Sequence, residues 1–89
     1  MKYNVKFAHA FKKSYRKLAQ KEQDLLFKLV DRLANNETLE EKYHDHQLKG
    51  KFAAYRECYI KPDLSLLYQK HNDILVLVCI NIGSHSELF

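Results

Sequence analysis

The chain has 89 residues, the length of one small domain, so residues 1–89 are expected to form a single domain with a modest core. A hydrophobic content of 46% excludes a disordered protein, and a net charge of +4 suits a nucleic acid or an acidic protein as partner. The start of the sequence lacks a signal-peptide pattern, and the longest apolar run, residues 74–80, is too short to cross a bilayer. We therefore expect a cytoplasmic protein without a membrane partner, in which Cys58 and Cys79 are buried thiols.

Two patterns of hydrophobic residues divide the first third of the chain. Apolar and polar residues alternate over residues 2–7, which predicts a strand with one solvated face. Phe11, Tyr15 and Leu18 then recur at helical spacing among basic residues, so we expect a first helix with a basic outer side. A second helix is expected over residues 22–34, with an apolar stripe on one face and acidic residues near its start.

The remainder of the chain predicts a long loop and three strands. Residues 37–50 are polar and lack a period, which is typical of a connecting loop, and long loops are often functional. Strands are expected over residues 52–60, 64–69 and 74–82, with a turn at Pro62-Asp63 between the first two. The last strand is apolar on both faces, which places it inside the sheet.

This order of elements, β-α-α-β-β-β, predicts an α+β domain. We expect a mainly antiparallel four-stranded sheet in which the last three strands form a meander and the first strand lies beside them. Both helices would pack on one face of the sheet. The other face would stay open, and a substrate would lie there.

Histidine side chains are the first candidates for chemistry, because imidazole can act as a general acid or base near neutral pH. His44 and His46 form a His-x-His pair that could hold a metal ion, but no third ligand is evident, so we predict no metal site. His85 follows a glycine that ends the last strand, and its alternative role is a plain C-terminal turn. His9 and His71 are expected to be solvated.

Acidic and basic residues near the strands have both a structural and a functional interpretation. Asp63 is interpreted either as a residue that stabilises the turn or as part of a site. Lys49 and Lys51 are interpreted either as solvated surface residues or as a phosphate-binding pair. Alternation along the strand places Arg56 on the face opposite to Tyr59. Arg56 would then contact RNA only if a bulge intervenes, and otherwise it would pair with an acidic residue of the helical layer, such as Asp31.

Several motifs in the second half of the chain resemble one bacterial family. They are Asp45-His46 followed by Leu48, Arg56-Glu57-Cys58 leading into Lys61-Pro62-Asp63, Tyr68 at the end of the next strand, and Gly83-Ser84-His85-Ser86-Glu87-Leu88-Phe89. In order and spacing they are similar to the YafQ branch of the RelE-type toxins. The resemblance covers the length of the chain. It implies a RelE-like fold and a small ribonuclease that uses no cofactor and no metal.

The resemblance also implies a site and a reaction. His85 would be the general acid, His46 with Asp63 would form the base side, and a 2′-oxygen would attack the neighbouring phosphate to leave a cyclic phosphate. RNA-binding residues would be Lys49, Lys51, Arg56 and Phe89, the last packed against a base.

Two positions depart from the family pattern. Tyr59 stands where a second catalytic histidine is usual, and Asn81 stands where an arginine is usual. A tyrosine can donate a hydrogen bond but is a poor base at neutral pH, and asparagine lacks the charge of a phosphate clamp. Both changes would reduce activity, so Tyr59 is kept as a candidate catalytic residue with a weaker role.

The first hypothesis is an endoribonuclease toxin that cleaves mRNA at the ribosome and is neutralised by a cognate antitoxin. The alternative is a catalytically silent relative that binds its antitoxin and acts as a co-repressor of its operon. In both cases operator DNA would be contacted only through the antitoxin complex. A gyrase poison on the same fold is disfavoured, because such relatives do not carry this histidine and aspartate set.

Overall fold

A computed structural model describes residues 2–89. In chain order its elements are β1 (Asn4–Phe7), α1 (His9–Tyr15), α2 (Gln20–Ala34), the 3-10 helix η1 (Glu41–Tyr43), β2 (His46–Gln47), the 3-10 helix η2 (Gly50–Phe52), β3 (Arg56–Lys61), β4 (Leu64–His71), β5 (Val76–Gly83) and α3 (His85–Leu88).

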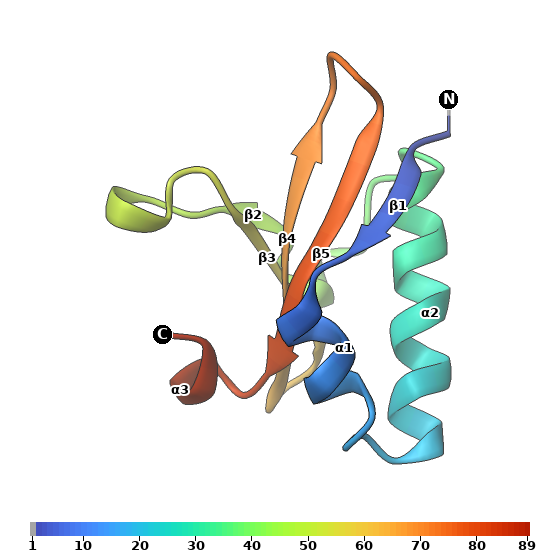
Figure 1. Cartoon of the computed structure of the whole chain (residues 1–89), viewed down its shortest axis with the longest axis vertical. Helices are drawn as coiled ribbons and strands as arrows, with labels where there is room; N and C mark the ends of the chain where they lie inside the picture. Colours follow the sequence, from blue (N-terminus) through green and yellow to red (C-terminus); the bar gives the residue numbers. More distant parts are fainter. Residues whose placement is uncertain (1) are drawn as a thin grey trace.

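The strands form one mixed sheet with the order β1-β5-β4-β3-β2. β1 runs parallel to β5, and the other neighbouring pairs are antiparallel. α1 and α2 pack on one side of the sheet, whereas α3 lies on the other side near the C-terminal end of β5 (Figure 1). The predicted α+β class and the two helices on one face are therefore confirmed. None of the helices within residues 2–89 is long and apolar enough to span a bilayer.

The hydrophobic core lies between α2 and the sheet. Apolar residues recur along α2 with the helical period, so Leu26, Leu29 and Leu33 are all buried on one face. The first turn of α2 is closed by Glu22, whose carboxylate accepts a hydrogen bond of 3.0 Å from the backbone N–H of Ala19. The strands contribute the opposite half of the core through their helix-facing side chains, which are Cys58, Ile60, Leu64, Leu66, Tyr68, Leu77 and Cys79.

The structure corrects several predicted boundaries. The expected loop over residues 37–50 contains η1 and β2, so the sheet has five strands and not four. The strand expected from residue 52 begins at Arg56, because the chain first turns through η2 at Gly50, whose φ is +65°. The last strand begins at Val76, since Leu75 has a φ of +54° and belongs to the preceding turn. The first helix spans His9–Tyr15 and ends earlier than predicted.

The two cysteines should not react with alkylating reagents in the folded protein. Both thiols are fully buried, and burial raises the pKa of Cys79 to about 12 and that of Cys58 still further. Because the thiolate is the reactive species, we expect no labelling by iodoacetamide at pH 8 and two labels in denaturant, measured by mass spectrometry. Labelling of the native protein at the rate of a free thiol would contradict the buried placement.

Candidate active site

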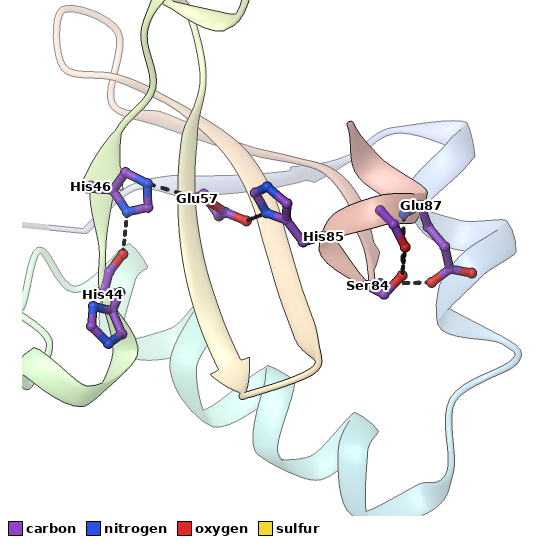
Figure 2. Close-up of polar contacts among 7 residues, drawn as sticks. His44, His46, Glu57, Ser84, His85 and Glu87 are labelled. Carbon is purple, nitrogen blue, oxygen red and sulfur yellow. Dashed lines mark hydrogen bonds and ion pairs between the residues drawn. The ribbon is translucent and has the colours of Figure 1, made fainter.

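A buried carboxylate lies at the centre of the candidate site. Glu57 is on β3 with its side chain on the face away from α2, and only 1% of its surface is exposed. One carboxylate oxygen is 3.1 Å from Nδ1 of His85, and the other is 3.5 Å from Nε2 of His46 (Figure 2). A buried carboxylate costs free energy unless it is paired, and here each oxygen has an imidazole partner.

The end of β5 fixes the position of His85. Ser84 caps α3: its backbone N–H donates to the Glu87 carboxylate at 2.7 Å, and its hydroxyl accepts from the Glu87 N–H at 3.2 Å. The same contact with Ser84 lowers the pKa of Glu87. A side chain at Gly83 would lie 3.1 Å from Glu87 Oε1, so glycine leaves room for this cap. His85, the first residue of α3, is thereby directed toward Glu57 (Figure 2).

β2 fixes the position of His46, because the backbone pairing places His46 directly opposite Glu57. Nδ1 of His46 is 2.5 Å from the backbone carbonyl of His44. With its proton on Nδ1, the imidazole donates to that carbonyl and turns Nε2 toward Glu57. The carbonyl reaches this position because His44 has a left-handed backbone, with φ +47° and ψ +44°. That conformation is uncommon for a residue other than glycine and often marks functional sites.

A polar network on the helix-facing side of the sheet holds the start of β2. Asp45 accepts a hydrogen bond from the buried hydroxyl of Tyr68 and forms an ion pair of 3.3 Å with Arg56. Nε of Arg56 also donates to the Tyr68 hydroxyl at 3.0 Å. Burial, with the neighbouring Asp45, raises the pKa of Tyr68. Burial lowers the pKa of Arg56, but the bonds to Tyr68 and Asp45 raise this pKa by more. The guanidinium therefore stays charged.

Aromatic rings border the site on the side of His85. The ring of Phe89 lies 4.8 Å from the His85 ring and 4.9 Å from the Phe52 ring, measured between centroids. The ammonium of Lys51 lies 5.3 Å from the centre of the Phe52 ring. Lys49 is exposed on the same segment. This border therefore offers flat apolar surface together with positive charge, a combination that suits single-stranded nucleic acid.

Two expected site residues lie elsewhere. Asp63 is in the turn between β3 and β4, its side chain is 80% exposed, and within residues 2–89 its ion-pair partner is Lys61 at 3.8 Å. Arg56 lies on the helix-facing side, as strand alternation requires, and its acidic partner is Asp45 and not Asp31. The structure thus brings His46 and His85 together but leaves Asp63 and Arg56 outside the group around Glu57.

The two departures from the family pattern also have unexpected surroundings. The carbonyl oxygen of the Asn81 side chain accepts a hydrogen bond of 2.8 Å from Ser14 on α1, so Asn81 points to the helical layer. An irregularity in the β4–β5 register, where Ile80 is skipped, immediately precedes Asn81 and was not predictable from alternation. Tyr59 contacts His44, with ring centroids 5.4 Å apart.

Sequence reasoning did not assign Glu57 a role, although it placed this residue on the substrate face. The available signal was a carboxylate within an apolar strand, followed directly by Cys58 and Ile60. Such residues are rarely buried unless they are paired. The sequence could not reveal that His46 is a partner of Glu57, because β2 is too short to be recognised. The register of β2 with β3 sets this contact.

A small α+β domain with two imidazoles on one buried carboxylate has the groups that acid–base chemistry requires. Comparisons with known proteins show that the chain is similar to small bacterial toxins. A protein family model described as a bacterial toxin of type II toxin–antitoxin systems, YafQ, matches residues 3–89. The chain is 35% identical over 77 residues to the mRNA interferase toxin YafQ of Escherichia coli, covering 82% of each protein. It is 40% identical over 60 residues to a YafQ protein of Haemophilus influenzae, covering 63% of this chain and 59% of that relative.

Solved structures show the same relationship. A copper-bound mutant toxin from Helicobacter pylori has a TM-score of 0.89 and 36% identity, over 98% of this chain and 99% of that one. The E. coli DinJ–YafQ toxin–antitoxin complex has a TM-score of 0.83 and 30% identity, over 100% of this chain and 99% of the matched chain. The chain belongs to the YafQ family of bacterial toxins of type II toxin–antitoxin systems.

The hydroxyl of Tyr68 should stabilise β2. Tyr68→Phe keeps the ring in the core but leaves Asp45 and Arg56 without a shared hydrogen-bond partner, which should cost about 1–2 kcal/mol in the free energy of unfolding. Urea denaturation measures this loss, and hydrogen exchange should become faster at the amides of His46 and Gln47. Tyr55→Phe is the matched control, and equal exchange in both variants would show that the network does not hold β2.

Proposed function

We propose that the chain is an endoribonuclease that cleaves mRNA by attack of a 2′-hydroxyl on the adjacent phosphate, without a metal ion. The observation that carries this proposal is the position of Glu57 between the imidazoles of His46 and His85. Transphosphorylation of RNA requires one group to remove a proton and another to donate one, and two imidazoles can supply both. The E. coli relative named an mRNA interferase toxin supports RNA as the substrate.

In the proposed reaction His46 is the base. Its Nδ1 proton is held by the carbonyl of His44, so the unprotonated Nε2, which faces Glu57 at 3.5 Å, takes the proton of the 2′-hydroxyl. The 2′-oxygen forms a bond to phosphorus while the bond from phosphorus to the 5′-oxygen breaks. His85, starting as the imidazolium, donates its Nε2 proton to that leaving oxygen. The products are a 2′,3′-cyclic phosphate and a free 5′-hydroxyl.

Glu57 offsets the positive charge at both stages. Before the reaction the proton is on His85, which is bonded to one carboxylate oxygen, and afterwards the proton is on His46, which faces the other oxygen. The carboxylate therefore does not need to move as the charge passes from one imidazole to the other, and such preorganisation lowers the cost of charge transfer. In this proposal Glu57 takes the place on the base side that the sequence suggested for Asp63.

The remaining candidate residues bind and position the RNA. Lys49 and Lys51 are exposed beside the site and would hold phosphates, and Phe89 would pack against a base next to His85. The assignments of Lys49, Lys51 and Phe89 rest on their positions around Glu57. Arg56 would act indirectly, through Asp45 and the placement of β2.

The proposed partners follow from the family. E. coli YafQ has been crystallised with the antitoxin DinJ, and we propose that a cognate antitoxin likewise neutralises this chain. Cleavage would take place on mRNA at the ribosome. Contact with operator DNA would occur only through the toxin–antitoxin complex.

Removal of the proposed acid, or of the charge of Glu57, should strongly reduce cleavage without loss of the fold. His85→Ala removes the proton donor from an exposed position, and Glu57→Gln keeps the shape of the side chain but removes its charge. Each change should reduce the cleavage rate at least about 100-fold, the usual scale for general acid–base catalysis. RNA cleavage assays with circular dichroism of the same preparations measure both effects.

The reference variant for this experiment is Asp63→Asn in the exposed turn, which should keep most of the activity if Glu57 fills the role on the base side. Full cleavage by the His85→Ala protein would refute the proposed acid. Antitoxin binding by a wild-type chain that cleaves no RNA, either free or on ribosomes, would favour the silent co-repressor.

Cleavage should persist in excess chelator. The proposed steps use only imidazole and carboxylate groups, and they require no ion to polarise the phosphate. Rates measured before and after treatment with EDTA, on RNA free of ribosomes where possible, should agree within a factor of two. Loss of cleavage that one specific divalent ion restores would instead assign a metal to His44, His46 or their neighbours.

A further inference from the structure

A groove opens beside the site at His44, which lies on the opposite side of Glu57 from His85 (Figure 2). Its volume is about 550 Å³, within the range of small-ligand sites. The floor is apolar and formed by Leu25 of α2 together with Ile60 and Pro62 at the end of β3. The walls carry the rings of Tyr59 and His44.

The two rings are not stacked face to face on each other. Their centroids are 5.4 Å apart with 52° between the planes, His44 is exposed and Tyr59 is half-buried. Both also line the groove, so a flat ring entering it would meet two π surfaces. Every nucleobase offers a flat π face of this kind, which makes aromatic pairs general platforms for single-stranded RNA.

His44 connects this groove directly to His46, the proposed base. Its left-handed backbone turns the carbonyl to Nδ1 of His46 and the ring to the opposite side, away from Glu57 (Figure 2). The residue that orients the proposed base therefore also forms a wall of the groove. A ligand packed on the His44 ring would hold in place the backbone that fixes the His46 tautomer.

The charge at the rim of the groove suits an RNA strand. Lys42 and Lys61 both line the groove, and no carboxylate does. The ammonium of Lys42 lies 5.1 Å from the centre of the Tyr43 ring, and within residues 2–89 no carboxylate is in ion-pair contact with it. Lys61 is paired with Glu22 at 2.7 Å. One unpaired cation at the rim is thus available for a phosphate next to a bound base.

We propose that the groove lined by His44 and Tyr59 binds a nucleobase of the RNA substrate on one side of the scissile phosphate. The rings of Phe52 and Phe89 would receive the base on the other side, so that an aromatic pair lies at each border of the Glu57 group. This inference rests on the proposed function and assigns Tyr59 to substrate binding and not to proton transfer. Base preference of the enzyme would then depend in part on this groove.

The test measures RNA binding separately from cleavage. The probe is an RNA that the wild type cleaves, but with a 2′-deoxy nucleotide at the cleavage position, so that the nucleophile is missing. Binding is measured with the free probe and with the probe bound in programmed ribosomes. Tyr59→Leu removes one ring, and His44→Asn removes the other while tolerating the left-handed backbone. Each should weaken binding about 10-fold, as expected for loss of one stacked base. Tyr59→Phe should bind like the wild type.

Two further arms identify what fills the groove. An RNA that lacks the base on one side of the cleavage position, the side that enters the groove, should bind wild type and Tyr59→Leu equally. An RNA that lacks the base on the other side should still bind Tyr59→Leu more weakly than the wild type. Phe27→Leu, an exposed ring of α2 on the helical side, is the matched control and should bind normally.

Equal binding by wild type and Tyr59→Leu on the intact probe would overturn the groove assignment while leaving the cleavage proposal in place. So would a Tyr59→Leu defect that is seen with the antitoxin but not with RNA, because the groove would then belong to a protein contact. A wild-type chain that neither binds nor cleaves RNA in either setting would instead overturn the proposed function itself.

Discussion

The burial of one carboxylate determines how the substrate face of this domain is built. Glu57 is almost fully removed from water, and the cost of that burial is offset by an imidazole on each oxygen. The two imidazoles come from opposite ends of the second half of the chain. The C-terminal segment and the short edge strand must therefore both be in place before the buried charge is compensated, which couples the formation of the site to completion of the fold.

The edge strand would not be stable through its backbone pairing alone, because it contributes only two residues to the sheet. It is held at its start by Asp45 and at its end by Gln47, whose side-chain amide donates to the carbonyls of Ala53 and Tyr55 at 2.5 and 2.9 Å. Arg56 and Tyr68 complete the contact at Asp45. The helix-facing side of the sheet thus supports the geometry of the opposite face, where Glu57 and His46 lie.

The sequence was sufficient for elements with a clear period and for motifs at the ends of strands. Alternation located the inner strands, helical spacing located α2, and the Gly83-Ser84-His85 motif pointed to the histidine that contacts Glu57. The remainder depends on register. Alternation could not reveal that the β4–β5 register skips Ile80, nor the pairing of a two-residue strand. The motif pattern consequently points to Asp63, which lies in an exposed turn, whereas the carboxylate that faces both imidazoles is the buried Glu57.

The order of the strands in the sheet has a consequence for the timing of activity during synthesis. β5 lies between β1 and β4, although it is the last of the five strands to be translated. Until it emerges, β1 has no neighbour in the sheet and the ligand of Glu57 that follows β5 does not exist. A nascent chain therefore contains His46 and Glu57 for the whole of that interval without His85, the proposed proton donor. The proposed site is complete only after β5 and α3 have left the exit tunnel and folded.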